Sequence, residues 1–210
     1  MKTALKKWTA PLLALAFVAT PAKAQEVMHQ VSSAKVSFEM QQTPEYSVGG
    51  PRAKKTTPLE WLEIEVELEV KTLAKSGYMD QLDAEFYVGV KDANNASKPV
   101  LMTGKFSFVD VRAAEGKAWL SAYVSPATLA KATGKNKPSK GDIVAVAVSV
   151  SGAGLQKPLA ESNGVSLKRE GTQWWEEPRF NRQDGSILAK SKTPFAPLWT
   201  DRYPLNKDQN

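Results

Sequence analysis

Two sets of side chains in this sequence have the types and spacing that a recognition surface needs. The first set is aromatic, and it begins where Trp174 and Trp175 stand side by side. Adjacent side chains on a strand point to opposite faces, so one ring of the pair would be exposed unless another segment covers it. Exposed indoles stack on sugars or anchor protein interfaces. We therefore predict a binding surface formed by the aromatic residues Trp174, Trp175, Phe195, Trp199 and Tyr203.

The same rings are also consistent with an intramolecular arrangement. In that arrangement the C-terminal residues fold back, and Phe195, Trp199 or Tyr203 covers the tryptophan pair. Large aromatic side chains are usually buried in soluble proteins. The sequence leaves both arrangements open.

The second set is a row of carboxylates within EWLEIEVELEV, residues 60–70. Apolar and charged residues alternate there, and a side-chain period of two gives a strand one dry and one wet face. Glutamate favours helices, but burying five large apolar side chains contributes on the order of 1.5 kcal/mol or more each, so we predict a strand. We favour a solvated face with lysine or arginine partners on neighbouring strands over a docking face. Its residues are Glu63, Glu65, Glu67 and Glu69.

Catalytic and metal sites are largely excluded by composition. The chain has a single histidine, His29, so a serine–histidine–aspartate site or a histidine metal site would depend on it alone. Glu176 and Glu177 resemble the acid pair of a glycoside hydrolase, but neighbouring residues on a strand diverge. No aspartate-rich loop offers converging calcium ligands. We therefore predict a protein that is not an enzyme and that carries no metal and no cofactor.

The first 24 residues have the pattern of a secretory signal peptide. Three lysines precede an apolar run over residues 11–20, and an Ala-Lys-Ala cleavage site ends at Ala24. The apolar run is much shorter than the about 20 residues that a transmembrane helix needs. We expect export and cleavage before Gln25, with the mature chain in the periplasm, at the periphery of the outer membrane or on the cell surface.

Charge and cysteine content exclude several further classes. The chain has 28 basic and 22 acidic residues, and loss of the four lysines of the signal peptide leaves 24 against 22, a net charge of +2. The basic residues are interleaved with acidic ones, so we expect no nucleic-acid partner. Because cysteine is absent, the protein has no disulfide, no thiolate metal site and no lipid-modified cysteine.

Alternating patterns like that of residues 60–70 recur along the chain with turn residues between them. Short strands at this spacing, without long helices between them, are typical of an antiparallel sandwich. We predict an all-β, immunoglobulin-like antiparallel β-sandwich of about seven strands. The expected strands are residues 34–40, 60–70, 82–90, 100–111, 117–124, 142–150 and 164–175, the last of them following a turn at Asn163-Gly164.

Three other segments complete the predicted organisation. One short helix is expected between Ser125, as N-cap with Pro126 behind it, and Gly134. Residues 43–58 are expected to form a long loop. Beyond Pro178 the chain contains prolines and aromatics with little periodicity, which favours an extended arm that docks on its own sandwich or on a partner, with a marginal hairpin at 183–189. The predicted divisions are 1–24 signal peptide, 25–177 β-sandwich and 178–210 C-terminal arm.

Three motifs together resemble a bacterial pilus-like secreted family with an immunoglobulin-like fold, encoded beside type IV pilus genes. They are PLEWLEIEVELEV at 58–70, DIVAVAVSV at 142–150 and WWEEPRF at 174–180. The resemblance implies a cell-envelope protein without known catalysis, structurally similar to archaeal pilus subunits. The sequence lacks the long apolar helix that follows the glycine-phenylalanine processing site of a true type IV pilin. An accessory role is therefore expected rather than polymerisation.

The predicted function follows from these observations together. We expect a non-enzymatic, structural or adhesion-related protein of the cell envelope, accessory to a type IV pilus-like system. Its expected partners are envelope or pilus proteins, with glycans and self-association as further options and only indirect association with a membrane. The alternative is a secreted glycan-binding module that uses exposed tryptophans.

Overall fold

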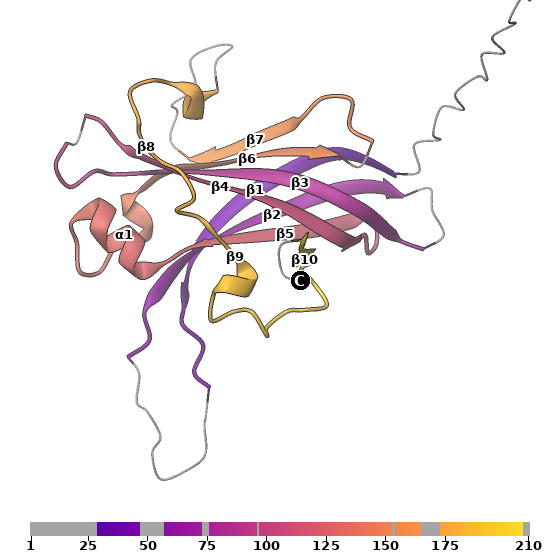
Figure 1. Cartoon of the computed structure of the whole chain (residues 1–210), viewed down its shortest axis with the longest axis horizontal. Helices are drawn as coiled ribbons and strands as arrows, with labels where there is room; N and C mark the ends of the chain where they lie inside the picture. The colour runs from indigo at the N-terminus through magenta and orange to yellow at the C-terminus, as the bar shows by residue number, and fades with distance from the viewer. Residues whose placement is uncertain are drawn as a thin grey trace, which may run out of the picture.

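The computed structural model describes residues 29–46, 57–72, 76–95, 97–152, 154–164 and 173–207. Within these ranges the chain forms ten strands in two sheets and one α-helix, which confirms the predicted all-β sandwich with a short helix (Figure 1). The predicted signal peptide lies outside the described residues. The described helices are all too short or too polar to cross a membrane.

The first sheet contains four strands in the order β1-β2-β5-β9, and each pairs antiparallel with its neighbour. The row of glutamates lies on a strand, as the alternation of residues 60–70 predicted, and this strand, β2, is central in the sheet. The strand bounds are β1 His29–Gln42, β2 Glu60–Thr72, β5 Lys117–Val124 and β9 Leu188–Ala189.

The second sheet contains six strands. Its order is β10-β4-β3-β6-β7, and β8 lies parallel to β4 on the same edge as β10. The edge strands β1 and β7 of the two sheets lie side by side, and the Asn163 amide donates to the Val36 carbonyl across 3.1 Å (Figure 1). The bounds are β3 Tyr78–Val90, β4 Val100–Arg112, β6 Ile143–Gly152, β7 Leu159–Gly164, β8 Asn181–Gln183 and β10 Leu205–Asn206.

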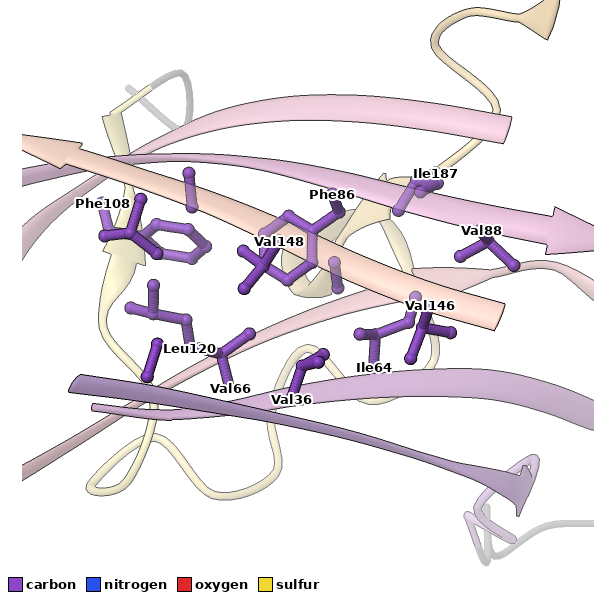
Figure 2. Packing of buried hydrophobic residues seen from close by; sticks show 14 of the residues in the cluster. Val36, Ile64, Val66, Phe86, Val88, Phe108, Leu120, Val146, Val148 and Ile187 are labelled. Atoms are coloured by element: carbon purple, nitrogen blue, oxygen red, sulfur yellow. The ribbon is translucent and has the colours of Figure 1, made fainter. Parts of the chain in front are cut away.

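The main core fills the space between the sheets. Every second residue of β2, from Leu62 to Val70, is at most 5% exposed, because the strand turns its apolar face inward. Burial of each such side chain contributes about 1.5–3 kcal/mol. Figure 2 shows side chains of both layers facing one another, together with one from the C-terminal arm: Val36, Ile64, Val66, Phe86, Val88, Phe108, Leu120, Val146, Val148 and Ile187.

The single α-helix, α1, spans Pro126–Thr133 and begins and ends at the predicted residues. The Ser125 side chain accepts a hydrogen bond from the backbone N–H of Thr128, and Gly134 ends the helix in the left-handed conformation. Short 3-10 helices lie at Lys140–Asp142, Trp174–Glu176 and Lys190–Lys192.

Three details of the sequence prediction are wrong. Most of the predicted strand at 164–175 lies outside the described residues, but its described end is a 3-10 turn at Trp174–Glu176 and not a strand. The seventh long strand is β7, which ends at Gly164. Asn163 and Gly164 pair with β6 as part of β7. The segment 183–189 forms no hairpin, because β8 joins β4 whereas β9 joins β5.

The C-terminal arm adds short strands to both sheets. It places β8 and β10 along β4 and β9 along β5 (Figure 1). Between β8 and β9 the Thr103 hydroxyl donates to the Asp184 carboxylate across 2.8 Å, and Ile187 enters the main core. The arm therefore docks on the sandwich of its own chain, one of the two arrangements that the sequence left open.

A candidate binding cavity beneath the C-terminal arm

The structure places the predicted aromatic residues on two opposite faces of the sandwich. Trp174 and Trp175 lie on the outer face of the six-stranded sheet and are 2% and 5% exposed. Trp175 stacks on Tyr87 with ring centroids 4.9 Å apart, and Trp174 packs against Phe180 at 5.5 Å. Gly89 lies directly beneath the Trp174 ring, where a Cβ atom would meet the indole at 3.3 Å. The tryptophan pair is therefore covered by residues other than Phe195, Trp199 and Tyr203.

The other three rings lie on the outer face of the four-stranded sheet. Phe195 is 1% exposed and stacks on Tyr123 of β5 at 5.0 Å, with the edge of Trp61 at 6.1 Å. Trp199 stacks on Phe195 at 6.2 Å and contacts Tyr203 edge-on at 6.3 Å. Among the five predicted residues, Trp199 is the one with substantial exposure, at 42%.

The glutamate row of β2 lies beside these rings, and its members differ in environment. Glu67 forms an ion pair with Lys117 at 2.5 Å, and Glu69 is exposed at the end of the row. The hydrogen bond from Lys117 lowers the pKa of Glu67. This half of the row agrees with the solvated face with basic partners that the sequence favoured.

The other half of the row lies under the arm. The Glu65 carboxylate accepts hydrogen bonds from Arg202 at 2.8 and 3.1 Å and from the Tyr203 hydroxyl at 2.5 Å. The Arg202 guanidinium also lies 4.6 Å from the centre of the Trp119 ring, so it is held between a carboxylate and an aromatic face. Burial opposes its charge, but Glu65 raises the pKa of Arg202.

Glu63 is the buried member of the row, 7% exposed. Its carboxylate accepts a hydrogen bond from the Tyr123 hydroxyl at 2.6 Å, and the Gln41 side chain is a second partner. Burial raises the pKa of Glu63, and the neighbouring Glu65 charge raises it further, while the two hydrogen bonds oppose the change. Burial likewise raises the pKa of Tyr123 far above its ordinary value.

These groups surround a cavity of about 370 Å³ between β1, β2 and the arm. This volume lies within the usual range for small-ligand sites, about 300–1,000 Å³. The wall combines carboxylates, an amide, a guanidinium and aromatic rings. Its residues are Ser37, Phe38, Glu39, Gln41, Glu63, Glu65, Trp199, Arg202 and Tyr203.

Sequence reasoning identified four of these lining residues, namely Glu63, Glu65, Trp199 and Tyr203, but placed them in two separate groups. It missed the other five, which are Ser37, Phe38, Glu39, Gln41 and Arg202. The alternation of β1 could have placed Gln41 beside the glutamate row, since Gln41 is the cross-strand partner of Trp61. No signal in the sequence indicated that Arg202 would meet Glu65, because the two are 137 positions apart.

Comparisons with known proteins agree with the architecture. The chain is similar to a solved protein from Akkermansia muciniphila, with a TM-score of 0.69 and 25% sequence identity over 87% of this chain and 96% of that chain. Comparison with curated proteins gives no match. A protein-family model matches residues 22–210, nearly the whole sequence. The Akkermansia protein is pilus-associated, and the match over nearly the whole sequence shows that the chain belongs to the family that this model describes.

Proposed function

We propose that this protein is a non-enzymatic, structural or adhesion-related component of the cell envelope that acts as an accessory to a type IV pilus-like system. The observation that carries the proposal is the family match over residues 22–210 together with the pilus association of the Akkermansia relative. The similarity covers 87% of this chain and 96% of that chain, so most of the fold is shared.

Export is part of the proposal. The lysine-rich start, the apolar run and the Ala-Lys-Ala site support a signal peptide. The mature chain would then work in the periplasm, at the outer-membrane periphery or on the cell surface, next to other envelope proteins.

A crosslinked pull-down from intact cells tests this role. A tag placed after Asn210 leaves the signal peptide free, and captured proteins are identified by mass spectrometry. We expect pilus or secretion components in the eluate, at levels well above those captured by an unrelated exported protein with the same tag. An eluate that lacks them would contradict the accessory role.

Two surface variants then locate the contact. Trp199 and Tyr78 are similarly exposed, at 42% and 46%, but only Trp199 lines the cavity under the arm. If the partner uses the arm face, Trp199→Ala reduces capture and Tyr78→Ala does not. The reverse result would place the contact on the neighbouring surface, where Tyr78 lines a second hollow beside Thr200 and Asp201 of the arm.

A second candidate function is glycan binding, and one observation favours it. The cavity has an exposed indole at its rim and hydrogen-bonding carboxylates in its wall, a combination suited to sugars. Adhesion through a glycan is compatible with a pilus-associated role, so the two candidates do not exclude each other.

A further inference from the structure

The cavity beneath the arm has a definite charge pattern, which determines what it can bind. Three carboxylates line it. The Glu39 carboxylate is paired with Lys140 at 2.6 Å, and the Glu65 carboxylate is paired with Arg202. Glu63 has hydroxyl and amide partners and takes part in none of the ion pairs found among the described residues.

The two described basic side chains at the cavity, Arg202 and Lys140, each already form an ion pair with a carboxylate. Arg202 directs its Nε and one Nη atom at Glu65 and lies over the Trp119 ring. Lys140 lies over the Phe38 ring in addition to its contact with Glu39. An anionic ligand would therefore meet the Glu63 carboxylate without a free cation to balance it, and such an arrangement is unfavourable.

The remaining features favour a ligand rich in hydroxyl groups. Carboxylate oxygens accept hydrogen bonds from hydroxyls, and the Gln41 amide both donates and accepts. At the rim, one face of the Trp199 ring stacks on Phe195, and the residue as a whole is 42% exposed. Apolar C–H faces of a pyranose ring pack on such an indole, while its hydroxyl edge faces polar groups.

The backbone holds the indole in this place. Trp199 has a positive φ of 52°, which is costly for a bulky residue, and its carbonyl accepts hydrogen bonds from the N–H groups of Arg202 and Tyr203. One tight turn therefore carries three of the lining side chains. The turn is anchored to β2 through Glu65, so the rim and the wall are fixed relative to each other.

From this arrangement we propose that the cavity binds one sugar ring that bears no negative charge, stacked on Trp199 with its hydroxyl edge toward Glu63 and Gln41. The inference rests on the glycan-binding candidate and defines its ligand class. Sugars that carry carboxylate or sulfate groups at the bound ring are excluded by Glu63.

The test is a titration of residues 25–210 with neutral oligosaccharides that end in glucose, galactose, mannose or N-acetylglucosamine, followed by tryptophan fluorescence and calorimetry. At least one is expected to bind, and Trp199→Ala is expected to weaken that binding at least about tenfold, because it removes the stacking face. Tyr78→Ala, an equally exposed aromatic outside the cavity, should leave the affinity unchanged.

Charge selectivity is tested with a matched pair of ligands: the neutral oligosaccharide that binds, and the same oligosaccharide with C6 of its terminal ring oxidised to a carboxylate. The acidic ligand should bind more weakly. Glu63→Gln should narrow the difference in affinity between the two ligands, whereas Glu69→Gln on the exposed end of the same strand should not. Equal or tighter binding of the acidic sugar overturns the proposed class.

Two further results would also overturn it: no neutral sugar bound up to about 10 mM, or Trp199-dependent binding of a lysine-rich peptide in place of a sugar. Neither result affects the pull-down, so failure of the sugar site and failure of the pilus-related role can be told apart.

Discussion

At residue 63 the alternating pattern of β2 places a carboxyl group on the outer face, yet the folded protein leaves it only 7% exposed. Three residues along the same face, Glu65, Glu67 and Glu69, keep more contact with water. The difference arises from the neighbours: a tyrosine and a glutamine hold Glu63, whereas Glu67 has a lysine. A single sequence motif thus contains a buried acid and ordinary surface acids.

Glu63 predicts a specific dependence of stability on pH. Its pKa in the folded state is raised above the ordinary 4.5, so the folded protein binds this proton more tightly than the unfolded chain does. The stabilisation is therefore complete below about pH 4.5 and is lost as the pH rises through the raised pKa. Across that pH interval, we expect the free energy of unfolding of the wild type, measured in urea, to fall relative to that of Glu63→Gln.

Glu69→Gln is the matched control, since it removes a charge from the same strand face at an exposed position. Its stability difference from wild type should show no comparable pH dependence. A flat difference between wild type and Glu63→Gln would contradict the raised pKa.

At the scale of elements, β4 is the strand on which the arm depends. Its edge pairs with β8 at Val100–Met102 and with β10 at Phe108 and Val109, and Gly104 lies between the two pairings. A Cβ atom at Gly104 would lie 2.7 Å from the Ile187 Cβ and 3.1 Å from the Ile187 carbonyl. The absence of a side chain there allows the arm to cross the strand closely.

Gly104→Ala should therefore push the arm away from β4. Overpacking of this kind costs about 1–3 kcal/mol, and we expect that loss in urea unfolding, with faster protease cleavage within the arm. Gly141→Ala is the control, because the nearest atom to its new Cβ would be at an ordinary 3.7 Å. Equal stability of the two variants would contradict the close crossing.

The strands were predictable to the extent that their faces differ in polarity. Residues 60–70 alternate cleanly because one face is core and the other is outer surface. Strand β7, LAESNG, has mostly polar residues and lies at a sheet edge, so no alternation revealed it. Trp174 and Trp175 resemble strand residues, but a 3-10 turn turns both rings onto the sheet. Two adjacent tryptophans in a sequence therefore do not distinguish a strand from a 3-10 turn.

The candidate cavity was predictable only in part. Local pattern identified Glu63 and Glu65 as one face and Trp199 and Tyr203 as a set of aromatics. Their meeting depends on the path of the arm, which the sequence does not encode as a periodic signal. The pairing of Arg202 and Tyr203 with Glu65 joins segments more than 130 positions apart and became visible only in the folded molecule.

For the whole molecule, the arm is the element that joins the two layers from outside. Its residues bury Phe180 against the six-stranded sheet, Phe195 against the four-stranded sheet and Ile187 in the core between them. A segment with these three contacts belongs to the folded unit even though it has few regular strands.

Truncation after Glu177 should consequently lower stability strongly. Loss of a buried phenylalanine alone costs about 3–5 kcal/mol, so removal of several such side chains should lower Tm by at least about 10 °C. Truncation after Asn206 is the control, since Lys207 is exposed and the paired strand β10 is kept. An unchanged melting temperature for the first truncation would show that the arm contributes little in cis.

The position of the arm also bears on when the protein can fold. The arm follows all seven long strands along the chain, yet it supplies part of their core and pairs with strands made much earlier, such as β4. Contacts so distant in sequence are slow to form, and they cannot form before the arm has been synthesised. Until then β4 and β5 have uncovered edges, and the unfinished sandwich is a substrate for chaperones and for strand pairing between chains.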